Sequence, residues 1–339
     1  MLGTYTTYEL ANMIKIVQPP SQFFSDTFFP AMITSEKEEI SFDVETDGEQ
    51  LAPFVHPSVQ GKIIEGEGYQ TNTFKPAYIK VKSGLRPGQV IKRRAGEQFG
   101  GSLSNEQRRQ LMIAGYLQDH ENRIQRRIEV MAAEALVYGR VTVVGDDYPE
   151  KVVDFGRKAS NTIALAGAAR WSDSNSTPLK DLEDWSLRCL DETGFAGDTL
   201  ILSSSAWNLL SKHNDFNDQL DRRRGIKDVP FISPEVAKRV QYKGAIGDFD
   251  IFVYSGRYKN KSGGVVQLMD DNRALMIARE GLKGIQAYGA IQDLSNLVAI
   301  DRYTKMWEEK DPSIEVMLTQ TAPLVVPRLP NAVVSVVVN

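Results

Sequence analysis

An uninterrupted stretch of helix-favouring sequence constrains the fold more than any other feature of the chain. Residues 104–107, Ser-Asn-Glu-Gln, have the spacing of a capping box, in which Ser104 and Gln107 satisfy the first free backbone donors. No proline follows until Pro149, and Gly139 provides a natural helix end. Apolar residues recur there at helical spacing: Ile113, Leu117, Ile124, Ile128, Met131 and Ala135. The sequence therefore predicts a helix over residues 104–138, about 50 Å long at about 1.5 Å per residue.

The remaining positions of this helix form a charged face. They are Arg108, Arg109, Asp119, Glu121, Arg123, Arg126, Arg127 and Glu129. A coiled coil is the alternative, but the apolar repeat is too short and irregular for several sustained heptads. We therefore expect one long helix lying across a sheet.

Residues 1–100 favour extended structure. Proline at positions 19, 20, 30, 53, 57, 76 and 87 excludes long helices and a continuous sheet. Segments 40–44 and 78–82 alternate apolar and polar residues, which is typical of ribbon strands with one polar face. A two-stranded ribbon is marginally stable without a surface to cover it. This third of the chain is expected to depend on neighbouring copies.

Charge is segregated within the same region. Residues 36–49 hold seven acidic residues and one lysine, whereas residues 62–97 are predominantly basic. One interpretation is solvated loop charge, since exposed ion pairs contribute only about 0–1 kcal/mol each. The other is that the acidic arm of one copy lies against the basic ribbon of another, where many weak pairs favour correct partner choice. The candidate contacts are Glu36, Glu38, Glu39, Lys80, Lys82, Arg93 and Arg94.

Four phenylalanines cluster between prolines near the N-terminus: Phe23, Phe24, Phe28 and Phe29. The arm alone offers no core to receive them. They either anchor the arm on the chain's own folded body or insert into an adjacent copy as buried hot spots. Both alternatives stay open at the level of sequence.

The rest of the chain reads as a mixed α+β region with its own core. A strand pair is expected at 141–144 and 152–155, a polar crossover at 159–177, and helices at 179–192 and 205–213. Strands are expected at 199–202, 240–242, 249–254, 265–269, 274–278 and 283–288. The tail, 314–319 and 324–338, returns to strand composition, with prolines confining it to edges and bends.

Composition narrows the possible functions. The 339 residues allow about two domains, and a net charge of −4 gives no general attraction to nucleic acid phosphates. A single cysteine, Cys189, excludes an internal disulfide framework, and its apolar neighbours indicate a buried thiol. No secretory signal or membrane-spanning apolar run is expected.

Catalytic and metal-binding motifs are absent from the sequence. It has no phosphate-binding glycine loop, nucleophile elbow or His-Glu-x-x-His pattern, and the histidines at 56, 120 and 213 are far apart. The acidic pairs 146–147 and 270–271 fit turns better than a cation site, which needs about six oxygen ligands. Arg222, Arg223 and Arg224 are flanked by aspartates, which favours a contact with neighbouring copies over nucleic acid binding. No enzymatic activity or cofactor is predicted.

Several segments carry a resemblance to a known family. The strongest is residues 240–258, VQYKGAIGDFDIFVYSGRY, followed by AYGAIQD at 287–293. Others are DRRRG at 221–225, QTAPL at 320–324, YTT at 5–7 and FKPAYIKVK at 74–82. In this order they resemble the major head proteins of phage lambda and its relatives across essentially the whole chain.

The resemblance implies a major capsid subunit with the Hong Kong ninety-seven type of α+β capsid fold. Such a subunit would have an N-terminal arm (1–35), an extended loop (36–100), a peripheral domain with the spine helix (101–177 and 301–339) and an axial domain (178–300). Assembly would proceed through pentamers and hexamers in the bacterial cytoplasm to an icosahedral virion shell enclosing DNA. The implied partners are scaffold, portal and a decoration protein in some relatives; no membrane contact is implied.

Two alternatives remain. An encapsulin-like nanocompartment shell shares the implied fold and would bind cargo enzymes. An unrelated α+β enzyme would require clustered acid, base or metal-binding groups, which the residue spacing does not show.

Overall fold

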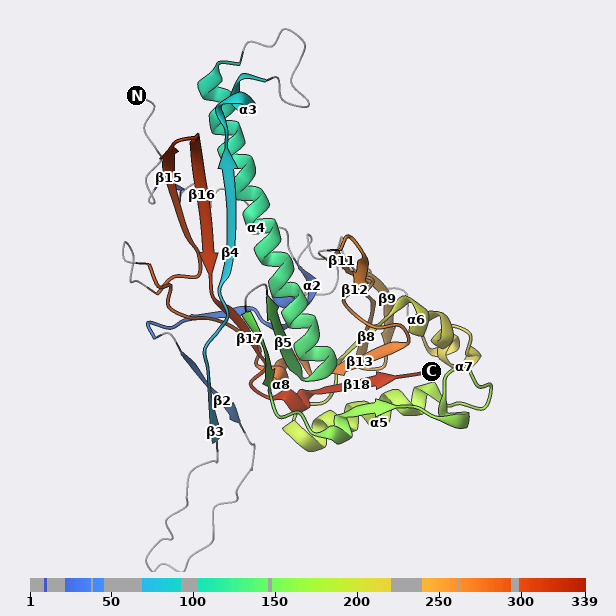
Figure 1. Ribbon diagram of the computed structural model, residues 1–339. Coiled ribbons are helices and arrows are strands. Elements are labelled where there is room, and N and C mark those ends of the chain that lie inside the picture. Colours follow the sequence, from blue (N-terminus) through green and yellow to red (C-terminus); the bar gives the residue numbers. More distant parts are fainter. Residues whose placement is uncertain are drawn as a thin grey trace, which may run out of the picture.

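A long helix lies between two sheets in the computed structural model of the protein (Figure 1). The structure describes residues 9–10, 22–37, 39–45, 69–92, 103–145, 148–220, 240–260, 262–293 and 299–339. Helices and strands are both well represented in these ranges, so the fold is α+β, as predicted.

Helix α4 (Asn105–Tyr138) confirms the predicted long helix and both of its ends. Ser104 Oγ accepts the Gln107 amide at 3.2 Å, and Gln107 Oε1 accepts the Ser104 amide at 2.9 Å, which completes the capping box. Gly139 follows in the left-handed conformation with φ of 69°, where a side chain would be strained. The 34 residues of the helix span about 50 Å at about 1.5 Å per residue.

The N-terminal half of α4 packs against a three-stranded sheet with the order β15-β16-β4. Its strands are β15 (Tyr303–Lys310), β16 (Ser313–Thr321) and β4 (Ile79–Leu85), and the short helix α3 (Pro87–Ile91) follows β4. Ile113 and Leu117 of the helix meet Leu85 and Met317 of the sheet in a small apolar cluster. The helix therefore lies across a sheet, as predicted, although strands remote in the sequence build it.

The C-terminal half of α4 adjoins a mixed six-stranded sheet with the order β7-β18-β13-β8-β10-β9. The strands are β7 (Thr162–Ala164), β18 (Val333–Val337), β13 (Arg273–Ile277), β8 (Thr199–Leu202), β10 (Phe249–Val253) and β9 (Gln241–Ile246). Helices α5 (Pro178–Thr193), α6 (Ser204–Leu210) and α7 (Asn214–Gln219) accompany it. Strands β8 and β13 are buried along their whole length, which matches the apolar residues that follow Thr199 in β8 and Arg273 in β13.

Two strands of this sheet lie outside the 178–300 segment. We expected 301–339 to return entirely to the part of the fold that contains the long helix, but β18 pairs with β13 over five residue pairs. β7 in turn pairs with β18 in parallel. The four valines of β18, which flank the buried Ser335, explain the difference, because such a strand is stabilised between two neighbours inside a sheet rather than at an edge.

Smaller elements connect these layers. β1 (Ala31–Thr34) pairs with β14 (Ile285–Tyr288), which pairs with β17 (Pro323–Val326). Two-stranded ribbons form from β2 (Ile40–Glu45) and β3 (Tyr69–Phe74), from β5 (Arg140–Gly145) and β6 (Tyr148–Asp154), and from β11 (Arg257–Lys259) and β12 (Val265–Gln267). The β2–β3 ribbon extends away from the body (Figure 1). Helices α2 (Phe23–Phe28) and α8 (Arg279–Leu282) and 3-10 turns at Ala159–Asn161, Gly167–Ala169 and Pro330–Ala332 complete the described elements.

The main hydrophobic core is shared between the long helix and the six-stranded sheet. It includes Ile124, Ile128 and Leu136 of α4 together with Leu200 and Leu275 of the sheet. The sequence predicted a separate core for the sheet region. The shared core instead fixes the C-terminal half of α4 to the sheet.

Candidate intersubunit surfaces

The four N-terminal phenylalanines are buried within the chain itself. Phe23, Phe24 and Phe29 have no exposed surface, and Phe28 is 2% exposed. The ring centroid of Phe24 lies 4.5 Å from that of Tyr254, and the ring of Phe23 stacks on Tyr254 at 5.5 Å. Of the two alternatives, the structure therefore supports the internal anchor. Their alternative role as contacts with an adjacent subunit was wrong, because the four side chains are already buried in their own chain.

A buried carboxylate on α4 holds this aromatic helix in place. Glu129 Oε1 accepts the Phe24 amide and Glu129 Oε2 accepts the Ser25 amide, both at 2.9 Å, at the N-terminus of α2. Glu129 Oε1 also accepts the Tyr254 hydroxyl at 3.0 Å. Burial raises the pKa of Glu129, while the three donors act in the opposite direction. Glu129 thus joins α2, α4 and the end of β10.

Three residues assigned to the charged helix face are buried: Arg109, Glu121 and Glu129. Arg109 makes two hydrogen bonds with Glu315 of β16. Glu121 Oε2 accepts Arg302 Nε at 3.2 Å, with both side chains at most 7% exposed. Helical spacing alone did not reveal these contacts, because the partners lie more than 180 residues away in sequence.

A polar belt separates the two apolar clusters along α4. His120 is fully buried; its Nε2 lies 2.8 Å from Ser83 Oγ and its Nδ1 lies 2.9 Å from Thr319 Oγ1. Burial lowers the pKa of His120 to about 4, which keeps the ring neutral. This histidine is therefore part of the contact between α4 and the three-stranded sheet.

The charged arm and ribbon are only partly described by the structure. Glu36, Glu39 and Lys80 are exposed. Lys82 Nζ lies 3.9 Å from Glu309 and 5.4 Å from the centre of the Trp307 ring, so it already has partners within the chain. Glu38, Arg93, Arg94, Arg222, Arg223 and Arg224 lie outside the described residues.

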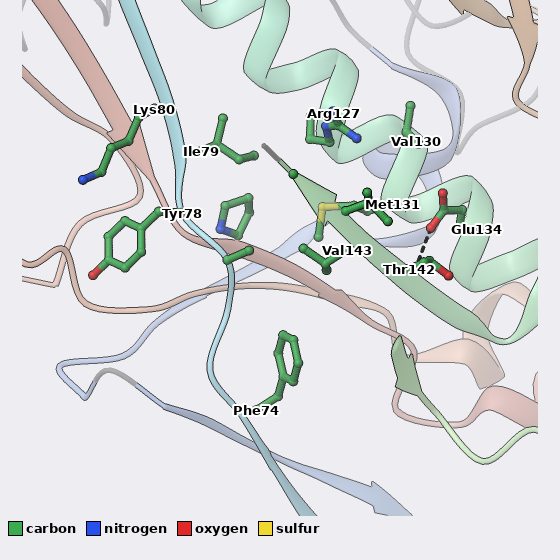
Figure 2. Close-up of a pocket in the computed structure, with 14 residues that line it drawn as sticks. Phe74, Tyr78, Ile79, Lys80, Arg127, Val130, Met131, Glu134, Thr142 and Val143 are labelled. Carbon is green, nitrogen blue, oxygen red and sulfur yellow. Dashed lines mark hydrogen bonds between the residues drawn. The ribbon is translucent and has the colours of Figure 1, made fainter. Parts of the chain in front are cut away.

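A groove of about 360 Å³ opens at the root of the ribbon, between α4, β5 and β4 (Figure 2). Apolar side chains make up most of its wall: Phe74, Ile79, Val130, Met131, Val143 and Pro323. Lys80 and Arg127 add positive charge, whereas Glu134 accepts the Thr142 amide at 2.9 Å. This combination suits an extended segment with apolar and acidic side chains.

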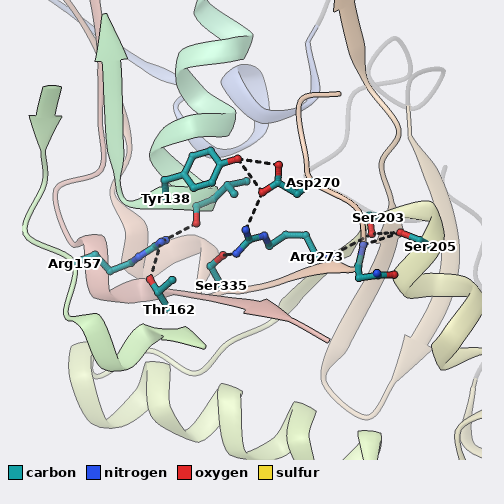
Figure 3. A network of polar contacts seen from close by, with 10 residues as sticks. Tyr138, Arg157, Thr162, Ser203, Ser205, Asp270, Arg273 and Ser335 are labelled. Carbon is teal, nitrogen blue, oxygen red and sulfur yellow. Dashed lines mark hydrogen bonds and ion pairs between the residues drawn. The ribbon is translucent and has the colours of Figure 1, made fainter. Parts of the chain in front are cut away.

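A second polar network fastens the C-terminal end of α4 to the six-stranded sheet (Figure 3). Arg157 donates to the Leu136 carbonyl at 2.6 Å and to the Val137 carbonyl at 2.8 Å, which caps the helix end. The Tyr138 hydroxyl donates to Asp270, which also pairs with Arg273 of β13 at 2.8 Å. Asp270 thus links the end of α4 to β13 through Tyr138 and Arg273.

Cys189 and possible metal-binding or membrane-spanning segments are the remaining candidates for a role other than a structural one. Cys189 is buried, as the sequence predicted, and burial raises the pKa of its thiol to about 12. Within the described ranges, no cluster of three His, Cys, Asp or Glu side chains is arranged to hold a metal ion. In the same ranges, no helix combines the length and apolar content needed to cross a membrane.

Comparison with known proteins gives matches along essentially the whole chain. Residues 6–338 match the family described as Phage major capsid protein E. The P21 prophage-derived major head protein of Escherichia coli O6:H1 is 30% identical over 331 residues, 96% of each chain. The major capsid protein of Escherichia phage lambda is 28% identical over 343 residues, 99% of each chain. The crystal structure of the putative capsid protein of a prophage of E. coli CFT073 has 24% identity and a TM-score of 0.80, covering 99% of this chain and 100% of its own.

The structural match confirms the α+β fold of the Hong Kong ninety-seven type that the resemblance implied. The family match places the chain in the class of phage capsid proteins. The chain belongs to the Phage major capsid protein E family, and it is a major capsid protein of the lambda-like phage or prophage head type. This is a family of structural proteins rather than enzymes. Such a protein is a component of a virion capsid and forms a shell from copies of itself.

Proposed function

We propose that this subunit assembles through pentamers and hexamers into an icosahedral phage or prophage head around double-stranded DNA. The observation that carries the proposal is the 96–99% coverage, in both directions, of the match to head proteins of a P21 prophage and phage lambda. A net charge of −4 supports enclosure of DNA without strong or sequence-specific binding. Assembly takes place in the host cytoplasm, and scaffold, portal and, in some systems, decoration proteins are the expected partners.

Within such a shell, the structural units take the roles of the predicted regions. Helix α4 with β4, β15 and β16 forms the peripheral domain, and the β2–β3 ribbon belongs to the extended loop. The six-stranded sheet with α5–α7 forms the axial domain, now including β7 and β18. The N-terminal arm (1–35) is anchored on its own subunit through α2.

The acidic arm supplies one contact between subunits in this proposal. Exposed Glu36 and Glu39, together with Glu38, face a basic surface of a neighbouring copy that includes Lys80, Arg93 and Arg94. The groove beside Lys80 supports this arrangement, because most of its wall is apolar and Lys80 and Arg127 add positive charge to it. Reversal of all three glutamates to lysine is expected to lower assembly yield and to invert its salt dependence, as measured by sedimentation. Unchanged yield at all salt concentrations would rule this contact out.

Electron microscopy of the purified, overexpressed protein tests the main proposal. Closed shells, tubes or capsomer rings are expected. A protein that stays monomeric at every concentration and ionic strength contradicts it. An encapsulin-like shell is the second candidate for a closed particle, and neighbouring genes for portal and terminase would decide for the phage head.

A further inference from the structure

The outer face of α5 presents apolar side chains to solvent. Leu187 is 54% exposed, Leu190 is 40% exposed, and Phe195, just beyond the helix end, is 36% exposed. Glu183 lies four residues before Leu187 and Asp191 four residues after it, so both carboxylates share this face. Single exposed apolar residues are ordinary, but an adjacent group with a charged rim marks an interaction site.

The opposite face of α5 explains why these residues remain outside. Leu182, Trp185 and Cys189 are buried at the contact of α5 with the six-stranded sheet. A helix packed on one sheet face cannot also bury Leu187 and Leu190, which point away from it. These two leucines are therefore available to another molecule.

The β11–β12 hairpin has a complementary outer face. Arg257 pairs with Gln267 and Lys259 pairs with Val265, and all four side chains are exposed, Val265 by 58%. Tyr258 and Val266, which alternate with them, are half-buried. The outer face thus carries two cations and an apolar valine.

Asn260 makes hydrogen bonds to two residues that precede β12. Asn260 Oδ1 accepts the Gly264 amide at 2.7 Å and the Ser262 hydroxyl at 2.8 Å. Gly263 has φ of 83°, which a side chain would strain.

We propose that the outer face of α5 in one subunit binds the outer face of the β11–β12 hairpin in a second copy of the chain. Leu187 and Leu190 then cover Val265, while Glu183 and Asp191 face Arg257 and Lys259. This inference rests on the proposed shell function and names one contact within the capsomer ring.

The positions of the two surfaces support a contact between copies. Figure 1 places α5 beside β18 and the hairpin beyond β9, on opposite sides of the six-stranded sheet, so they do not meet within one chain. Two different, complementary surfaces on one molecule form a head-to-tail contact between copies. Such contacts close into a ring when the rotation from each copy to the next brings the last copy back to the first. Opposite charge at the rim sets the direction of the ring and rejects like-charged neighbours.

Charge reversal tests the contact in the full-length protein. The α5 variant is Glu183→Lys with Asp191→Lys, the hairpin variant is Arg257→Glu with Lys259→Glu, and a combined variant carries all four changes. Each single-surface variant is expected to raise the protein concentration required for assembly about tenfold or more, and the combined variant to restore it to within about threefold. Glu150→Lys with Glu308→Lys makes the same charge change as the α5 variant at exposed positions elsewhere and is its matched control.

A mixture of the two single-surface variants gives a sharper test. Alternating copies satisfy every contact in a six-membered ring, whereas a five-membered ring always keeps one like-charged contact. Equal amounts are therefore expected to form rings or tubes of hexamers without closed shells, as seen by electron microscopy. Closed shells from this mixture would overturn the inference.

The remaining outcomes are also decisive. Assembly of either single-surface variant at the wild-type concentration, or failure of the combined variant to recover, overturns the contact. If a charge reversal lowers the melting temperature, Val265→Glu, at an exposed position, is used in its place. The same tenfold rise in the protein concentration required for assembly is expected, and an unchanged concentration would count against the contact. Failure of the wild-type chain itself to form particles would instead contradict the proposed function.

Discussion

Replacement of Glu129 measures how strongly the fold depends on a buried carboxylate that joins α2, α4 and β10. Three donors reach it: the amides of Phe24 and Ser25 at 2.9 Å and the Tyr254 hydroxyl at 3.0 Å. Glu129→Ala leaves all three buried and unsatisfied. Because each such donor costs about 1–3 kcal/mol, we expect the free energy of unfolding to fall by about 3–6 kcal/mol. Glu129→Gln keeps one acceptor oxygen but turns an N–H group towards a donor, so the free energy of unfolding is expected to fall by about 2 kcal/mol.

Urea unfolding of the unassembled subunit, followed by tryptophan fluorescence, measures these losses. Asp119→Ala on the same helix is the control, since it removes only an exposed pair with Arg123 and should cost less than about 0.5 kcal/mol. Tyr254→Phe added to Glu129→Ala removes one unsatisfied donor and should recover about 1 kcal/mol. A Glu129→Ala subunit within about 1 kcal/mol of wild type would refute the reasoning.

Three further predictions concern α4 and α5. Burial lowers the pKa of His120 from 6.5 to about 4. The contribution of the neutral ring to the free energy of unfolding is therefore complete above pH 6.5 and falls as the pH drops towards 4. Between pH 7 and pH 4.5 the wild-type free energy of unfolding should fall by up to about 3 kcal/mol through this histidine, and His120→Gln should remove most of that fall, as measured by urea unfolding at both pH values. Gly139→Ala should cost about 1–2 kcal/mol, because φ is 69° and the new Cβ would lie 2.9 Å from Arg157, whereas Gly88→Ala, with open space, should cost less in the same assay. The buried Cys189 thiol, with its pKa raised to about 12, should react with a disulfide reagent only as fast as the fold opens.

Local signals in the sequence predicted the helix ends well. The capping box at Ser104 and the glycine at 139 act within one turn of the chain, so their effect does not depend on the rest of the fold. The same holds for α5, which was predicted over 179–192 and is followed by Gly194 with φ of 74°. The strand pair β5–β6 also follows from local alternation around a turn.

Long-range contacts left no such signal. Helical periodicity put Arg109 and Glu129 on a solvated face, but Glu315 and the amides of α2 lie far away in sequence and bury both charges. The sequence left the anchoring of the aromatic arm open for the same reason, because its receiving surface is made partly by Tyr254. The sheet position of β18 depends on β13 and β7, which no local pattern identifies.

The internal burial of the aromatic arm changes the physical account of assembly. If the four phenylalanines had to enter a neighbour, folding and assembly would be coupled, and an isolated subunit would expose a large apolar surface. Because α2 is instead satisfied by Glu129 and Tyr254, the subunit can fold before it meets another copy. Contacts between copies then need only modest strength each, since every subunit of a closed shell makes several of them at once. Weak contacts with strict charge complementarity also allow a wrongly placed subunit to dissociate before the shell closes.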